Sequence, residues 1–271
     1  MATLRHSTGR VRSPSPVATL SGGDRLLVSI CIVLITGLAW AYLVHLARQM
    51  APAMEYNTAM ADMGMPMHAP WTAVDLVFTV VMWVVMMVGM MAGAAAPVLL
   101  LFAGTRAARG EHGEPLTVLM FGLGYLTVWS GFGACAALAQ WALHQTAMLS
   151  PAMAASSPRI AGTILVAAGA YQLTPLKSAC LTYCRSPLGF LMTNWRDGKM
   201  GALQMGARHG TYCLGCCWAL MCVLFVVGVM NLGWVMALTV FVLLEKVGPA
   251  GALVSRVAGA AMMGAGILAV I

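Results

Sequence analysis

Charge is the scarcest feature of this sequence. Only 8% of its 271 residues are Asp, Glu, Lys or Arg, whereas 61% are hydrophobic. A soluble domain carries about 25% charged residues, because its surface must be solvated. A chain with so few charges cannot cover a globule with polar groups, so its natural solvent is lipid. The sequence therefore predicts an integral membrane protein of all-α class, with no soluble domain.

Motifs of common enzymes are absent as well. The sequence contains no Gly-rich phosphate loop, no Ser/His/Asp triad signature and no internal repeat of the transporter type. The net charge of +7 could suggest nucleic acid, but the basic residues lie in short segments between apolar runs, as in cytoplasmic loops. We therefore assign no catalytic residue and expect no nucleic-acid partner.

What the sequence does contain is a series of apolar runs. Residues 1–25 are rich in Ser, Pro and Arg and are predicted to be a disordered tail, and residues 26–271 to be a bundle of about seven transmembrane helices. The sixth run is short and fits a tilted span, a half-helix or a re-entrant segment, so six spans are also possible. The predicted runs are Leu26–Ala47, Thr72–Phe102, Leu116–Leu143, Ile160–Leu176, Tyr212–Met230, Leu232–Leu244 and Gly251–Ile271.

The basic residues predict the orientation of these spans. With seven spans, nearly all Lys and Arg fall on one side, and the positive-inside rule assigns that side to the cytoplasm. We therefore predict a protein of the bacterial inner membrane with a cytoplasmic N-terminus. Residues 48–71 would form a Met-rich periplasmic loop, and residues 177–209 a basic cytoplasmic loop.

Sulfur is unusually abundant, with 23 Met and 8 Cys. In the predicted outer loop, three thioethers alternate beside an imidazole, at Met63, Met65, Met67 and His68. An extended chain directs alternating side chains to one side, and thioethers are soft ligands that select Cu(I). The alternative is a loop that packs on the membrane surface through its Met side chains.

The second run contains a methionine stripe, because Met82, Met86 and Met90 recur every four residues along a helix. Met87 and Met91 form a second stripe beside it. One interpretation is a ladder of thioethers through which Cu(I) exchanges. The other is a tight helix interface filled by flexible Met side chains.

A third group of candidate ligands combines thiols with an imidazole. Four of its members fall within roughly 100° of one helix face, and two more precede them in the predicted inner loop. Cysteines in a reducing compartment indicate a metal or redox site, and these ligand types suit Cu(I) and Zn(II) alike. The alternative is that buried Cys acts only as a small hydrophobe. The six residues are His209, Cys213, Cys216, Cys217, Cys180 and Cys184.

We predict that at least three of these six side chains converge on one point. Cys222 lies on the opposite helix face and should not join them. Glu245 and Lys246 end the sixth run, and ionisable groups near membrane depth are functional candidates. The alternative for this pair is simple solvation or ion pairing at the interface.

Several segments resemble a bacterial family described as predicted metal-binding integral membrane proteins, a domain of unknown function. The most specific are Arg208–Trp218, which reads RHGTYCLGCCW, and Gln172–Lys177, which reads QLTPLK. The resemblance covers approximately residues 70–265, and it departs at Ala92-Gly93, where the family leads us to expect Leu-Pro. It implies a metal-binding membrane protein without naming the metal.

Together these features predict a membrane protein that binds a soft metal, most plausibly Cu(I) with Zn(II) possible, for uptake, transfer or cuproprotein assembly. The Met loop would capture the ion, the Met stripe would hold it, and the Cys/His group would receive it, with a membrane or periplasmic metalloprotein as a possible partner. Two alternatives stay open: a membrane thiol–disulfide oxidoreductase or assembly factor, and a helical scaffold without metal.

Overall fold

The computed structural model describes residues 22–65, 71–111, 115–150 and 153–271. Within these ranges every regular element is a helix, apart from one isolated bridge between Leu149 and Ala155. This confirms the predicted all-α class. The predicted tail falls mostly outside the described residues.

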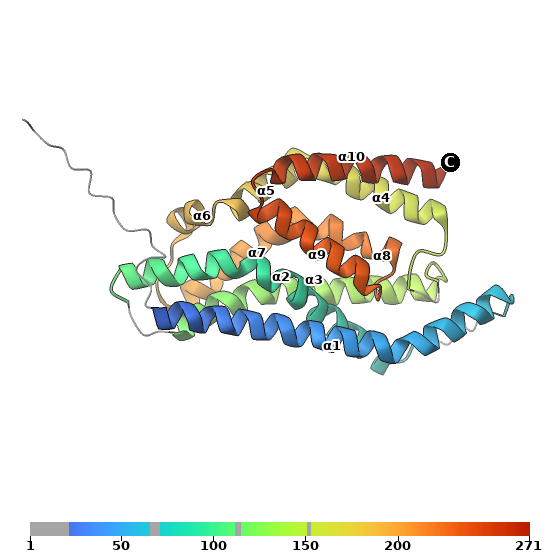
Figure 1. The fold of residues 1–271 in the computed structure, drawn as a ribbon, viewed down its shortest axis with the longest axis horizontal. Helices are drawn as coiled ribbons and strands as arrows, with labels where there is room; N and C mark the ends of the chain where they lie inside the picture. The colour runs from blue at the N-terminus through green and yellow to red at the C-terminus, as the bar shows by residue number, and fades with distance from the viewer. Residues whose placement is uncertain (1–21, 66–70, 112–114, 151–152) are drawn as a thin grey trace, which may run out of the picture.

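Five stretches of helix are long and apolar enough to cross a membrane, which makes the chain a multi-pass membrane protein. They lie roughly along the long axis of the bundle (Figure 1). These five are α1 (Gly22–Asp62), α2 (Ala73–Ala108), α3 (Pro115–Gln145), α7 (Gly198–Cys222) with its short continuation α8 (Leu224–Val227), and α10 (Gly251–Val270).

The remaining helices are shorter. The fourth and sixth predicted runs form α4 (Pro158–Gln172) and α9 (Leu232–Val247), with 15 and 16 residues. Both fall below the about 20 residues that an upright span needs. Between α4 and α7 lie α5 (Pro175–Arg185) and α6 (Pro187–Asn194).

Two segments predicted as loops are largely helical. α1 continues through residues 48–62, and α5, α6 and the first part of α7 occupy most of residues 177–209. The prediction ended each helix where hydropathy falls, but a helix continues past that point wherever its backbone hydrogen bonds are kept. Pro52 lies inside α1, which bends toward its C-terminal end (Figure 1).

Local sequence explains where the helices start. Thr72 and Asp75 form a reciprocal capping box at the start of α2, and the Ser157 and Thr174 side chains cap α4 and α5. Both α4 and α5 then have Pro in their first turn, where its missing N–H costs nothing.

Helix α7 lies at the centre of the molecule and contacts α3, α4, α5, α8 and α9. Its closest neighbour is α3, because both helices present glycine at the crossing. A Cβ atom at Gly124 would overlap the carbonyl of Leu203, and one at Gly206 would overlap the carbonyl of Phe121. Small residues at such a crossing let two backbones pack in direct contact, which drives helix association in lipid.

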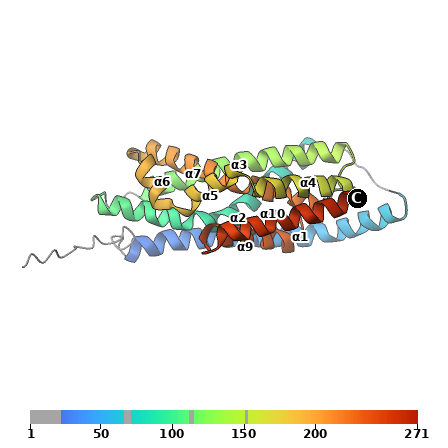
Figure 2. The ribbon, with the colours of Figure 1, turned by 90° about the horizontal axis from the view of Figure 1, so that it is seen from above.

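The second close pair is α4 with α10. Figure 2 shows these two helices side by side, consistent with their many mutual contacts. Gly162 and Gly169 of α4 meet Gly266 and Gly259 of α10. The two helices therefore pack as one unit against α7 and α9.

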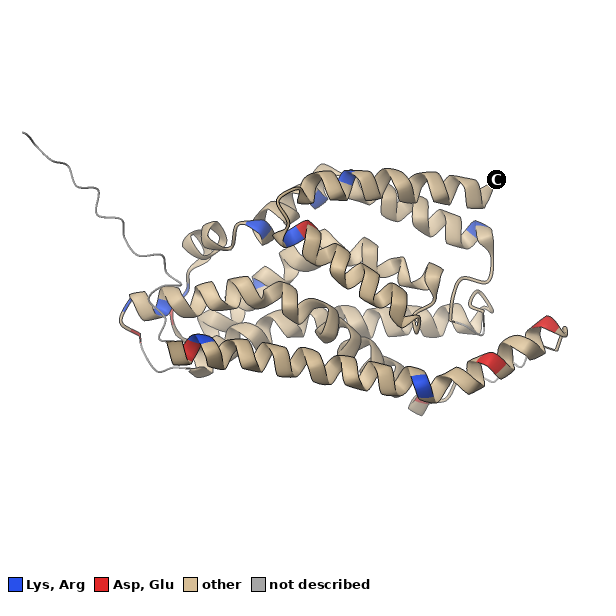
Figure 3. Cartoon of the chain, in the orientation of Figure 1, with Lys and Arg blue, Asp and Glu red and all other residues tan. Residues whose placement is uncertain are grey.

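Lys and Arg are unevenly distributed along the bundle. Figure 3 shows most of them toward the end where α1 begins and α2 ends, and near the turn between α9 and α10. The opposite end, where α1 ends and α4 begins, carries few. This unequal distribution is the pattern on which the positive-inside rule operates.

Candidate metal centre

Helix α7 presents its Cys/His face to the protein interior. His209, Cys213, Cys216 and Cys217 have exposed fractions of 3%, 1%, 1% and 0%. The three cysteines belong to the same buried core as the Met residues of α2. The predicted helix face is therefore real, and it points into the bundle rather than into lipid.

Helix α5 adds a fifth side chain to this face. The Sγ of Cys184 lies 3.8 Å from the Sγ of Cys216, which in turn lies 3.3 Å from the Sγ of Cys217. The Cys216 thiol also donates to the backbone carbonyl of Cys213 at 3.1 Å, so Cys213 adjoins the other three residues, Cys184, Cys216 and Cys217. We call these four residues the thiol cluster. Sulfurs that share one metal ion at bonds of about 2.3 Å lie roughly 3.5–4 Å apart, so the spacing in the cluster is close to that of a bound site.

Cys180 lies one turn before Cys184 in α5 but meets a different part of α7. A Cβ atom at Gly215 would be only 2.8 Å from the Cys180 sulfur, so this thiol rests against the bare backbone of α7. Helix α5 is not one of the five long apolar helices, and burial raises the pKa of the Cys180 thiol. In the described chain no hydrogen bond joins its sulfur to the thiol cluster.

Cys213 has two polar partners besides the other thiols. The ammonium of Lys246, at the end of α9, donates to its sulfur at 2.8 Å, and the Tyr125 hydroxyl from α3 lies 3.0 Å away. Four helices, α3, α5, α7 and α9, therefore meet at the thiol cluster. Lys246 and Tyr125 are themselves buried, at 8% and 2% exposure.

A buried ion pair lies beside the cluster. Lys177 of α5 donates to the Glu245 carboxylate of α9 at 2.7 Å, and both side chains are 1% exposed. Arg185 donates to the backbone carbonyl of Glu245. Of the two alternatives for Glu245, solvation is wrong and pairing is correct, with its second carboxylate oxygen lacking a hydrogen-bond partner among the described residues.

His209 lies one turn before Cys213, surrounded by aromatic rings. Its ring centroid is 5.0 Å from that of Phe190 and 6.0 Å from that of Tyr125. Its Nδ1 is buried and has no hydrogen-bond partner in the part of the chain that the structure describes. The imidazole therefore shares the helix face of the cluster, and its Nδ1 makes no hydrogen bond to a cluster sulfur among the described residues.

The methionine stripe of α2 is buried next to the cluster. Met82, Met86 and Met90 have exposed fractions of 5%, 1% and 1%, and Met87 and Met91 are fully buried. The Tyr125 hydroxyl joins the two sets, because it donates to the Met91 carbonyl at 3.2 Å and also meets the Cys213 sulfur. Both stripes face the interior, so packing and copper exchange stay open as roles.

The methionines of the predicted outer loop are arranged differently. Met63 and Met65 follow the end of α1 and are 61% and 53% exposed, whereas Met67 and His68 lie outside the described residues. Their exposure is compatible with both alternatives, copper contact and packing on the membrane surface. Their convergence with Met67 and His68 stays a prediction.

The thiol cluster is not a finished coordination shell. Among the described residues, no three or more His, Cys, Asp or Glu side chains are arranged to hold a metal ion as they stand. The short sulfur distances and this result agree if small side-chain movements accompany binding. The donor chemistry of several thiols beside thioethers fits a soft ion such as Cu(I).

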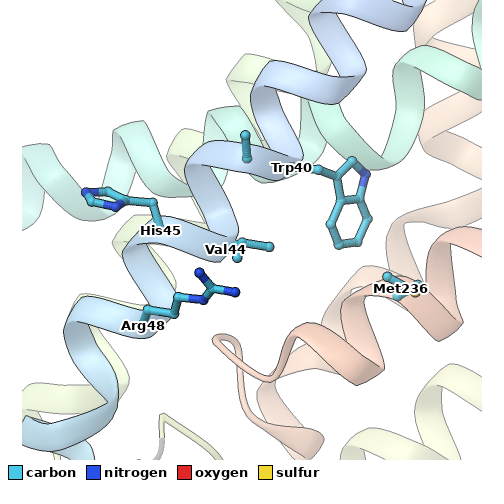
Figure 4. Close-up of a pocket in the computed structure, with 6 residues that line it drawn as sticks. Trp40, Val44, His45, Arg48 and Met236 are labelled. Atoms are coloured by element: carbon cyan, nitrogen blue, oxygen red, sulfur yellow. The ribbon is translucent and has the colours of Figure 1, made fainter.

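A separate pocket of about 490 Å³ opens between α1 and α9. It is lined by Trp40, Ala41, Val44, His45, Arg48 and Met236. In Figure 4 the Trp40 ring extends toward Met236, while His45 points away from it. None of these residues belongs to the thiol cluster, so we assign no copper ligand to the pocket.

Comparison with known proteins shows a family for this chain. Residues 80–269 match the family described as PpoB2, copper chaperone. The chain belongs to this copper chaperone family. Membership implies copper binding, and the matched region runs from α2 to α10, so it contains the thiol cluster and the methionine stripe but not the exposed Met63 and Met65. No curated protein and no solved structure matches the chain.

Two residues of this copper chaperone's core escaped the sequence analysis as site residues. Tyr125 and Lys177 both lie in segments that are apolar or near a predicted interface, and each contacts a partner far away in sequence. Lys177 did carry a signal, since a lysine at the end of an apolar run is costly unless paired. Nothing in the sequence shows that its partner is Glu245, 68 residues later.

Proposed function

We propose that this copper chaperone carries Cu(I) at the thiol cluster, inside the membrane bundle, and passes it to a partner metalloprotein. The observation that carries the proposal is the meeting of four thiols from α5 and α7, with sulfur separations of 3.3 and 3.8 Å. All eight cysteines are free, so thiolates are available as ligands. Transfer by exchange between soft ligands needs no enzymatic chemistry.

The proposed path begins at Met63, Met65, Met67 and His68, where thioethers and an imidazole capture copper outside the bundle. It continues along Met82, Met86 and Met90, which bind Cu(I) more weakly than thiolates do. Burial of this stripe in the same core as the cluster supports the order. His209 and Cys180 are additional ligands in this scheme. His209 can fill this role because one turn of helix separates it from Cys213.

We further propose seven spans with the N-terminus in the cytoplasm of a bacterial inner membrane. The uneven distribution of Lys and Arg supports this orientation (Figure 3). Arg208 is exposed on α7 five residues before Cys213, or roughly 7.5 Å along the axis, which favours a cluster just inside the inner interface.

A membrane-impermeant thiol reagent applied to intact cells should label a cysteine introduced at Glu55 but not one at Lys199. The reverse result would overturn the orientation.

The decisive experiment replaces individual thiols. Cys213→Ser and Cys217→Ser should each lower the copper content of protein purified under reducing conditions to below about a third of the parent value, because serine keeps the size but is a hard ligand. Elemental analysis of protein folded in detergent measures it.

Cys222→Ser is the matched control, since Cys222 is on α7 but outside the thiol cluster. It should keep the parent copper content. An equal copper content in the Cys213→Ser variant and the parent would contradict the assignment of the site.

The same protein distinguishes the thiol–disulfide alternative. Copper gives chelator-dependent protection of thiols from alkylation, whereas a redox pair gives loss of thiols that depends on oxidant. Protection of at least two thiols by Cu(I), and its reversal by a Cu(I) chelator, are the expected results. Oxidant-dependent loss without copper protection would favour the oxidoreductase, and neither effect would favour the scaffold.

A further inference from the structure

Lys246 is a buried cation that forms no ion pair with a carboxylate among the described residues. The residue is 8% exposed. The other buried lysine, Lys177, is neutralised by Glu245 at 2.7 Å. An ammonium in an apolar core is unfavourable unless an anion or a strong acceptor compensates it. The charge of Lys246 therefore needs a partner that the carboxylates do not provide.

The groups close to this ammonium are sulfurs. Lys246 donates to the Cys213 sulfur at 2.8 Å, and the Tyr125 hydroxyl lies 3.0 Å from the same sulfur. The thiolate is the form of cysteine that binds metals. The anion that compensates Lys246 is therefore the thiol cluster, when one or more of its cysteines are thiolates.

Copper binding makes the cluster negative. A Cu(I) ion held by two thiolates is a complex of net charge −1, and a net charge buried away from water is strongly disfavoured. One fixed positive charge in contact with a ligand sulfur cancels it. A metal-bound thiolate keeps free lone pairs, so Cys213 can accept the N–H of Lys246 and bind copper at the same time, as hydrogen-bonded ligands in metal sites commonly do.

We propose that Lys246 is the counter-ion of the copper–thiolate complex, and that it sets the Cu(I) affinity of the site through its contact with Cys213. This inference rests on the proposed function, because it requires Cys213 to be a ligand. It makes Lys246 a positioning and affinity-determining residue rather than a ligand. It also gives the Lys177–Glu245 pair a separate role, since that pair is already neutral and does not compensate copper.

The test compares Lys246→Met with Lys246→Arg in the full-length protein, with Lys199→Met as a control for a lysine that is exposed on α7. Anaerobic competition against a chromogenic Cu(I) chelator gives the dissociation constant, and thermal unfolding without copper gives the stability of the fold. We expect Lys246→Met to raise the dissociation constant about tenfold or more, whereas Lys246→Arg stays within about threefold of the parent. The metal-free Met variant should unfold no more easily than the parent, because it no longer buries an ammonium.

Two results would overturn the proposal. One is equal or tighter Cu(I) binding by Lys246→Met, which would make the ammonium irrelevant or a competitor of copper. The other is loss of both copper affinity and metal-free stability in the Met and Arg variants alike, which would make Lys246 a packing residue. The Cys213→Ser variant separates this proposal from the proposed function. If that variant keeps copper, the assignment of the site fails. If it loses copper while Lys246→Met binds copper normally, only the counter-ion role of Lys246 fails.

Discussion

At the scale of single residues, the clearest charged pair in this core is Lys177 with Glu245. Both are essentially inaccessible to solvent, so each depends on the other for compensation. Lys177→Met should lower the free energy of unfolding by about 3–5 kcal/mol, because it leaves a buried carboxylate uncompensated. Denaturant unfolding of the detergent-solubilised, metal-free protein measures the loss.

The double variant Lys177→Met, Glu245→Gln provides the control for this pair. Removing both charges should recover most of the stability, since neutral groups no longer require compensation. A double variant that is as unstable as the single one would show that packing, rather than charge, accounts for the loss.

Residue identity alone could predict only part of this site. The spacing of His209, Cys213, Cys216 and Cys217 is enough to predict one buried helix face, because helical periodicity fixes which side chains point together. It could not predict that Cys184 reaches the face while Cys180 does not, since that depends on how α5 packs on α7. Lys246 and Cys213 are 33 residues apart on two different helices, so their contact produces no local pattern in the sequence.

At the scale of helices, α3 and α7 depend on direct backbone contact. Gly124→Ala should lower the free energy of unfolding by about 1–3 kcal/mol, because the added methyl overlaps the Leu203 carbonyl and forces the helices apart. The shift would also move Tyr125 away from Cys213, since both lie close to this crossing. Thermal unfolding and copper content of the same sample report the two effects.

Gly131→Ala is the control in the same helix. No neighbouring atom lies within 4 Å of the position that its Cβ would occupy. It should leave stability unchanged or raise it by up to about 1 kcal/mol, because alanine favours helix over glycine. A Gly124 variant as stable as the Gly131 variant would contradict the close-contact account.

Helix extents show where hydropathy is informative and where it is not. The seven apolar runs reappear as α1, α2, α3, α4, α7 with α8, α9 and α10, because a lipid-facing backbone must be helical. The polar flanks at residues 48–62 and 198–209 were predicted as loops and are helical, since residues such as Arg48, Glu55 and Lys199 lower the hydropathy of a segment but are good helix formers.

At the scale of the whole molecule, the family match and the methionines divide the chain into two parts. The matched region begins at residue 80, so it includes the buried stripe of α2 and the thiol cluster but excludes the exposed Met63 and Met65. Copper binding by the core is therefore expected of the family. Capture by the outer methionines is a property that this chain must show by itself.

Changing Met63, Met65 and Met67 together to Leu tests that property. Leucine keeps the apolar bulk and removes the sulfur lone pairs, so folding should be intact while copper acquisition at low supply falls severalfold. The thiol cluster is unchanged in this variant, so at saturating copper its final copper content should equal that of the parent. A time course of copper content in cells at limiting and at saturating copper separates the rate of capture from the capacity of the cluster. Equal rates at limiting copper would show that these methionines are only apolar surface, and a lowered capacity at saturation would show that they are part of the storage site instead of its entrance.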